Sequence, residues 1–394
     1  MGARILILGT NGLSNEIAKN LVLAGVGHVR IQDAGIVDKE LLSAGGLFSI
    51  SESQLGCNRA EALCSSLKDM NPSVDFVAET SDVGALDAEL LSSYHYIIGT
   101  RGADAVREVA MCTAKVEADA TAGKDADAEP APKRQRGGGE SGPAVTRSNG
   151  THVICPMRHA HGAAATLPKF LAAGTMGLDG FCFFDLGMNT AVIEPPPPKD
   201  TDAAKPGASA VPPKQPVTEQ ALYPTVQMAS SVEWEALTPR VPRLYYALQL
   251  LIAQAAQPAE PDADVQVADA AVLLPSDAPP STVSLLRALL LHRARLLKTA
   301  GANAGAAKLL SDSYLATVAQ STLTELAPVT AIVGGMVASE VLKVISGKER
   351  PINNVLFFDG ETCDGVVQRC GPSFDCPWGL DKGDHKPARS QKVA

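Results

Sequence analysis

The first hundred residues alternate between short apolar runs and amphipathic segments, and this alternation limits the possible folds more than any other feature. The apolar runs have the length and composition of buried strands and lie at 4–8, 28–33, 73–78 and 94–99. The segments between them repeat apolar residues at helical spacing and lie at 15–23, 58–70 and 83–92. Such alternation predicts an α/β protein with a Rossmann-like, mostly parallel sheet and flanking helices.

The same patterns continue along the rest of the chain in separate pieces. Further strands are expected at 152–155 and 180–186, and a terminal hairpin at 355–358 and 365–369. Further helices are expected at 243–253, 281–297 and 329–345. The last of these helices is the longest and most apolar.

Composition divides the chain into six parts. Two long stretches have few bulky apolar residues, so they cannot bury enough surface to offset the entropy of ordering. We therefore expect an N-terminal Rossmann-like part at 1–113, a disordered insertion at 114–149, a continuation of the fold at 150–193, a Pro-rich linker at 194–221, the C-terminal part of the fold at 222–370 and a flexible tail at 371–394.

Overall composition argues against a nucleic-acid partner and against a membrane-spanning segment. The chain has 394 residues, of which 45% are hydrophobic and 20% charged, as is ordinary for a protein with a substantial core. Its net charge of −9 argues against a broad nucleic-acid-binding surface. Its apolar runs are too short or too interrupted by charge to predict a membrane span.

The cysteines and histidines do not predict a metal site. Eight cysteines are spread along the chain without a C-x-x-C pair, so neither a zinc site nor a disulfide framework is expected. We expect Cys57, Cys64 and Cys182 to be packing residues. His159 and His161 would share one face of a strand, but no further ligand stands at zinc spacing.

A basic cluster lies within the expected insertion. Lys133, Arg134 and Arg136 follow a Pro and stand in an acidic, apolar-poor stretch. This pattern indicates a nuclear-import signal, whereas the competing interpretation is a solvated run of charges. We expect localisation in the nucleus, with the cytoplasm as the alternative.

A glycine-containing loop joins the first strand to the first helix. Gly9 and Gly12 stand where a nucleotide-binding fold holds phosphate against a helix N-terminus, and Asp33 closes the second strand, where an acidic residue would bind a ribose. A G-x-G-x-x-G motif would also require glycine at positions 11 and 14, which are Asn11 and Ser14. Taken alone, the loop favours a tight turn that binds no nucleotide.

Several blocks resemble one family. They are 18–26, 56–62, 327–343 and 353–360, with further agreement at Trp234 and at 239–247. Together they resemble the ThiF-like adenylation subunits of enzymes that activate ubiquitin-like proteins, and within that family the small regulatory subunits that act on SUMO. This resemblance implies the ThiF adenylation fold and a heterodimer with a large catalytic subunit, in which SUMO is adenylated and then passed to a cysteine.

The resemblance also implies that the nucleotide site of this chain is degenerate. Active members carry D-x-D after the second strand; here the first Asp is Asp33 and the second is replaced by Gly35. Further positions that would hold phosphate or metal are replaced by Leu41, Ser43, Ala44 and Arg59. We therefore expect no catalytic or cofactor-binding residue in this chain, and ATP, Mg²⁺, zinc and the catalytic cysteine in the partner.

The apolar helix at 329–345 has two interpretations. It is a buried core helix, or it lies near the contact between the two subunits, as the resemblance implies. Gly334 and Gly335 in mid-helix cost about 1 kcal/mol each relative to Ala, which close approach of another backbone would offset. The candidate interface residues are Pro328, Gly334, Gly335 and Asn354.

Alternatives to this assignment remain open. The first is the regulatory subunit of a NEDD8-activating enzyme. The second is an NAD-dependent oxidoreductase that uses Gly9, Gly12 and Asp33, and the third is a scaffold that leaves adenylation unchanged. In the family, an arginine-bearing segment precedes the first strand and acts in the partner's ATP site; this sequence starts at the strand, so that contribution is assigned to no residue.

Overall fold

The structure is a computed structural model. It describes residues 2–43, 49–126, 144–146, 152–154, 167–193, 216–234, 237, 241–256, 267–299, 309–371 and 373–374. Several residues singled out in the sequence lie outside these ranges: Ala44, Lys133, Arg134, Arg136, His159 and His161.

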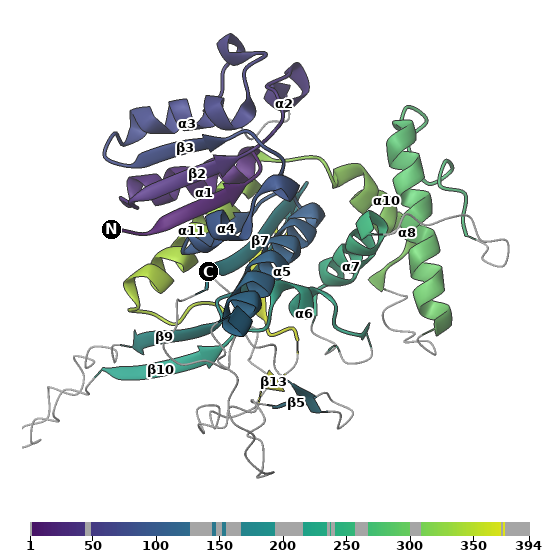
Figure 1. The fold of residues 1–394 in the computed structure, drawn as a ribbon. Helices are drawn as coiled ribbons and strands as arrows, with labels where there is room; N and C mark the ends of the chain where they lie inside the picture. The colour runs from purple at the N-terminus through teal and green to yellow at the C-terminus, as the bar shows by residue number, and fades with distance from the viewer. Residues whose placement is uncertain are drawn as a thin grey trace, which may run out of the picture.

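One eight-stranded sheet forms the centre of the molecule (Figure 1), in the order β12-β11-β8-β7-β4-β1-β2-β3. Its strands are β1 (Arg4–Leu8), β2 (His28–Gln32), β3 (Asp75–Glu79), β4 (Tyr96–Gly99), β7 (Lys169–Met176), β8 (Asp179–Asp185), β11 (Val355–Asp359) and β12 (Asp364–Gln368). Pairing is parallel from β3 through β7, and antiparallel from β7 through β8 and β11 to β12. The expected α/β fold with a mostly parallel sheet is therefore confirmed.

The sheet is buried on both faces because successive side chains of a strand point to opposite sides. In β1, Ile5 and Ile7 belong to one hydrophobic core and Leu6 and Leu8 to the other. All four side chains have 0% exposure. A strand that is apolar at every position thus requires helices on both faces.

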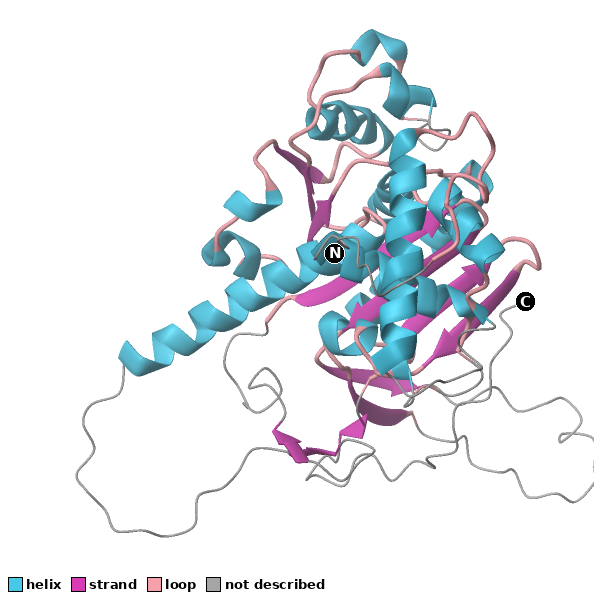
Figure 2. Cartoon of the chain, turned by 90° about the vertical axis from the view of Figure 1, so that its right-hand side faces the viewer, coloured by secondary structure: helices cyan, strands magenta, loops and turns pink. Residues whose placement is uncertain are grey.

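Each face is covered by its own helices (Figures 1 and 2). The first core includes α1 (Gly12–Leu23), α3 (Arg59–Met70) and α11 (Ala327–Ser346). The second includes α4 (Ala88–Ser92), α5 (Ala103–Ala126), α6 (Val226–Ser230), α7 (Arg243–Ala256), α8 (Pro280–Thr299) and α10 (Asp312–Ser321). The short α2 (Lys39–Ser43) and two 3₁₀ turns, η1 (Glu52–Gln54) and η2 (Val83–Ala85), lie along the chain between β2 and β4.

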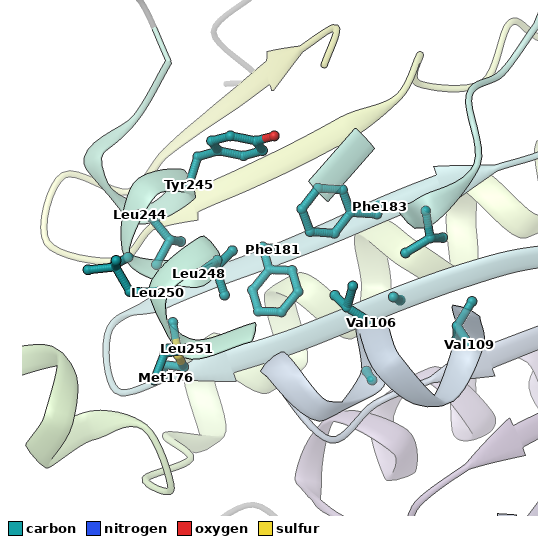
Figure 3. Packing of buried hydrophobic residues seen from close by; sticks show 14 of the residues in the cluster. Val106, Val109, Met176, Phe181, Phe183, Leu244, Tyr245, Leu248, Leu250 and Leu251 are labelled. Carbon is teal, nitrogen blue, oxygen red and sulfur yellow. The ribbon is translucent and has the colours of Figure 1, made fainter. Parts of the chain in front are cut away.

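Aromatic side chains fill the second core. Phe181 and Phe183 of β8 lie edge to face with their ring centroids 5.8 Å apart, and Tyr245 of α7 lies 6.4 Å from Phe183 (Figure 3). Val106 and Val109 of α5 belong to the same core. The aromatic contacts hold α7 against β8, since offset and edge-to-face aromatic pairs add to the free energy of burial, and α5 packs against β7 and α7.

Two expected boundaries are corrected by the structure. The insertion was expected to begin at 114, but α5 continues to Ala126, and the buried Val116 extends beyond that point the helical spacing set by Val109 and Cys112. The linker was expected to extend to 221, but β10 (Val217–Leu222) pairs with β9 (Met188–Ile193) in a two-stranded antiparallel sheet.

A third, smaller sheet joins the expected insertion to the expected tail. It consists of β5 (Ala144–Thr146), β6 (His152–Ile154) and β13 (Ser373–Phe374), with β5 in the middle. Pairing of β13 with β5 is antiparallel. Both segments therefore contain strand residues that the composition did not predict.

The apolar helix α11 lies against α1. By length and composition it is long and apolar enough to cross a membrane. In the structure, its buried residues, including Val333 and Val337, pack against α1, β7 and β8, as in the core helix of a folded domain. The two mid-helix glycines differ: a Cβ on Gly334 would lie 2.6 Å from Cβ of Glu16, whereas a Cβ on Gly335 would meet nothing within 4 Å.

This difference gives a matched pair of variants. We expect Gly334→Ala to lower the free energy of unfolding by about 2 kcal/mol, because the added methyl overlaps α1. Gly335→Ala should leave it unchanged or raise it by up to about 1 kcal/mol, because Ala favours helix more than Gly. Urea denaturation followed by circular dichroism measures both. Equal destabilisation by the two variants would contradict the packing.

Candidate functional site

The loops that follow β1, β2, β4 and β7 meet at the carboxyl edge of the parallel strands, where α/β folds bind ligands. The first of these loops begins at Gly9, whose φ of +98° favours glycine. A Cβ at Gly9 would also lie 2.8 Å from Cγ of Arg101, the residue that follows β4 by two positions. The space beside this glycine is therefore filled by the chain's own arginine.

Asp33 is buried at this edge and is bound entirely by neighbouring groups of the chain. One carboxylate oxygen accepts a hydrogen bond from the amide of Thr10 (2.8 Å) and the other from the amide of Gly35 (2.8 Å). Arg101 Nη2 lies 3.3 Å from Asp33 Oδ2. Because a buried carboxylate requires such partners, Asp33 has the role of a structural anchor for the loops in this structure.

Arg101 is shared between two carboxylates. Its Nη1 lies 2.7 Å from Oε1 of Glu108 on α5. Burial raises the pKa of the Glu108 carboxyl, and the charge of Arg101 opposes that rise. The Asp33–Arg101–Glu108 chain of charges thus links β2, the loop after β4 and α5.

The N-terminus of α1 has no unpaired amide in its first turn. Asn11 and Ser14, which replace two motif glycines, form a capping box: the Ser14 amide donates to Asn11 Oδ1, and the Asn11 amide donates to Ser14 Oγ. The Gly12 amide donates to Oε2 of Glu325 (2.6 Å), and the Leu13 amide to Oε1 of the same residue (3.4 Å). The Asn15 amide donates to the Asn11 carbonyl.

The positions expected to have lost their phosphate and metal ligands are also filled. Arg59 donates from Nε to the Ile36 carbonyl (2.7 Å) and pairs through Nη2 with Asp38 (2.9 Å). A Cβ on Gly35 would lie 3.1 Å from both Arg59 Nε and Asp33 Oδ1, so an Asp side chain would displace its neighbours. Leu41 is partly buried against the first core.

Bound ATP would compete with the chain's own groups at this edge. Its phosphates would meet the Glu325 carboxylate at the α1 N-terminus, and its ribose would compete with Arg101 for Asp33. No sequence motif pointed to Arg101, Glu325 or Thr175, whose hydroxyl lies 3.4 Å from Glu325 Oε1. Arg101 lies two positions after a predicted strand, so it could have been inferred from that position. Glu325 has no such local signal, since it lies 313 positions from Gly12.

The candidate interface residues separate into surface and interior. Pro328 is exposed in the first turn of α11, and Gly335 is partly exposed on that helix. Gly334 packs within the chain, as described above. Asn354 is a correction: it is fully buried, and its side chain exchanges two hydrogen bonds of 2.9 Å with the backbone of Cys370, so no partner reaches it.

The cysteines mostly agree with expectation. Cys64 and Cys182 are buried, and burial raises the pKa of the Cys64 thiol to about 12. Cys57 is a correction, because it is exposed in the loop before α3 rather than packed. Within the described ranges, no group of three or more His, Cys, Asp or Glu side chains is arranged to hold a metal ion.

The fold and this edge define a class of protein. A parallel sheet with a glycine turn after its first strand and an acidic residue after its second belongs to the nucleotide-binding α/β folds. A model of the ThiF family matches residues 2–377, so the chain belongs to the ThiF family. The matched range includes the block at 327–360. The alternative assignment, an NAD-dependent oxidoreductase, does not account for that block.

Curated relatives extend this similarity over nearly the full length. SUMO-activating enzyme subunit 1 of Rattus norvegicus is 26% identical over 383 residues, covering 94% of this chain and 88% of the relative. The Homo sapiens protein of that name is 26% identical over 388 residues, with 94% and 89% covered. SUMO-activating enzyme subunit 1A of Arabidopsis thaliana is 24% identical over 376 residues, with 94% and 90% covered.

A second titratable group lies near this edge. Asp179 begins β8 and stands opposite Asp359 of β11. Burial, followed by repulsion from Asp359, raises the pKa of Asp179 from 3.8 to about 6, and Arg243 opposes the rise. Because the folded state holds this proton more tightly than the unfolded state, the contribution of Asp179 to stability falls as pH rises from 3.8 to about 6.

We therefore expect Asp179→Asn to stabilise the protein above that window. At pH 7.5 the free energy of unfolding should rise by about 1 kcal/mol, discounted for partial exposure, because the neutral amide avoids the cost of a charged carboxylate. Below pH 4 the gain should vanish. Urea denaturation at both pH values measures the effect, with the exposed Asp277→Asn as control. A gain that is the same at both pH values would count against the shifted pKa.

Proposed function

We propose that this chain is the regulatory, non-ATP-binding subunit of a heterodimeric SUMO-activating enzyme. The large partner subunit would hold ATP and Mg²⁺, adenylate the C-terminus of SUMO and receive SUMO on its catalytic cysteine. The observation that supports the proposal is the carboxyl edge, where Arg101 pairs with Asp33 and Glu325 accepts hydrogen bonds from the Gly12 and Leu13 amides. The near full-length similarity to subunit 1 of SUMO-activating enzymes supports the same assignment.

The surface of α11 provides a candidate contact with the large subunit. On the face turned away from α1, Ile332 is 42% exposed and Gly335 leaves open space above the helix. Leu326 and Leu323, just before the helix, are 37% and 89% exposed. An apolar surface of this kind is typical of protein–protein contacts, and the open glycine would allow close approach of another backbone.

The chain's own part in the reaction is then to position the partner. The loop after β1, with Glu325 bound to its amides, holds α1 in place. In turn, α1 holds α11 through the contact at Gly334. A rigid α11 would present the same surface to the large subunit throughout the reaction. The basic cluster Lys133, Arg134 and Arg136 supports placing the complex in the nucleus.

Reconstitution tests this function. We expect ATP–pyrophosphate exchange with SUMO only when this chain and a SUMO-activating large subunit from the same organism are combined. Ile332→Glu should abolish co-elution and reduce exchange at least about tenfold, because it buries a charge in the contact. Val272→Glu, which alters an 80% exposed residue outside α11, is the matched control and should retain both.

The outcomes separate the alternatives. Exchange with NEDD8 and its large subunit, but not with SUMO, would assign the chain to the NEDD8-activating enzyme. A complex whose exchange equals that of the large subunit alone would make this chain a scaffold. An intact complex with Ile332→Glu would place the interface elsewhere, while leaving the subunit assignment in place.

A further inference from the structure

Glu325 lies in the segment between α10 and α11, far in sequence from the loop that it contacts. Backbone pairing fixes this segment across the end of β7: the Gly177 amide donates to the Thr324 carbonyl (2.8 Å), and Gly177 forms a bridge with Glu325. The carboxylate is thereby held over the first turn of α1. Both of its oxygens accept hydrogen bonds there: Oε2 from the Gly12 amide, and Oε1 at the longer distance of 3.4 Å from the Leu13 amide and the Thr175 hydroxyl.

An anion belongs at this place for physical reasons. The first amides of a helix have no partner within the helix, and the helix dipole favours negative charge beside them. No acidic residue of α1 lies in its own first turn. In nucleotide-binding folds a phosphate of the ligand fills this position. Here the Glu325 carboxylate has the same sign of charge and accepts from the same amides.

The loop and the first turn of α1 also hold buried polar atoms that no described group of the chain satisfies. Thr10 is 3% exposed and Asn15 is 1% exposed. Within the described residues, Thr10 Oγ1 and Asn15 Oδ1 have no hydrogen-bond partner. Buried polar atoms are rarely left unpaired, so such atoms indicate a ligand or water that the protein groups do not replace. The loop has therefore kept part of the polar lining of a ligand site.

We propose that Glu325 is an internal substitute for phosphate, and that removing its carboxylate turns the α1 N-terminus into a binding site for a di- or triphosphate. The site is closed by a side chain of this chain, in addition to having lost ligands at Gly35 and Leu41. Its amides and its glycine turn are otherwise retained. This proposal rests on the proposed function in one respect: both treat the loop after β1 as a nucleotide-binding loop that no longer binds nucleotide.

Binding of inorganic pyrophosphate to the isolated full chain tests this proposal without the partner, so its failure is distinct from failure of the reconstitution. By isothermal titration calorimetry, we expect Glu325→Ala to bind at least about tenfold more tightly than the unaltered chain, in the range of anion stabilisation at helix N-termini. Glu89→Ala removes an exposed carboxylate on α4 and is the control for net charge; it should bind no better than the unaltered chain.

Two results would overturn the proposal: equal affinity of Glu325→Ala and Glu89→Ala, or tight binding of pyrophosphate by the unaltered chain. Should Glu325→Ala fail to fold, Glu325→Gln keeps an acceptor for the Gly12 amide but removes the charge. In that variant we expect the Gly12 amide proton resonance to move upfield, because a charge-assisted hydrogen bond becomes a neutral one. An unmoved Gly12 resonance would show that the carboxylate does not occupy the α1 N-terminus.

Discussion

Burial of the central strands on both faces is the constraint from which the rest of the structure follows. A strand such as β1, with Ile5 and Ile7 toward one core and Leu6 and Leu8 toward the other, loses stability wherever either face meets water. Helices must therefore lie on both sides, and the connections between strands and helices are forced to the ends of the sheet. The loops that carry Gly9, Asp33 and Arg101 meet at one edge for that reason.

At that edge the fold meets a second requirement, which is to satisfy buried charge. A nucleotide-binding member of such a fold leaves the α1 amides and an acidic residue available to its ligand. This chain pairs Asp33 with Arg101 and places Glu325 on the Gly12 and Leu13 amides. The buried groups are thus stabilised without a bound nucleotide, and α1 is held in the position against which Gly334 of α11 packs.

Local patterns predicted most of the regular elements. The strands β1 to β4, the helices α1, α3, α7, α8 and α11, and the β11–β12 hairpin all carry a clear period of apolar residues, and each was placed within a few residues. Predictions failed where composition hid the pattern. The Ala-rich end of α5 resembles an insertion because small residues give a weak period, and β10 was missed because it pairs with β9 at the surface rather than in the core.

The sequence by itself determined the α/β class, the position of the glycine turn and the absence of a polar side chain at Gly35 and Leu41, because those depend on residue type and short-range spacing. Only the tertiary structure decided what fills the site. Glu325 reaches the α1 N-terminus from 313 positions away, and no local signal marks a side chain that acts at such separation. Likewise, Gly334 and Gly335 are adjacent glycines in the same helix, so residue type does not distinguish them. Only the approach of α1 on one side of α11 gives them different surroundings.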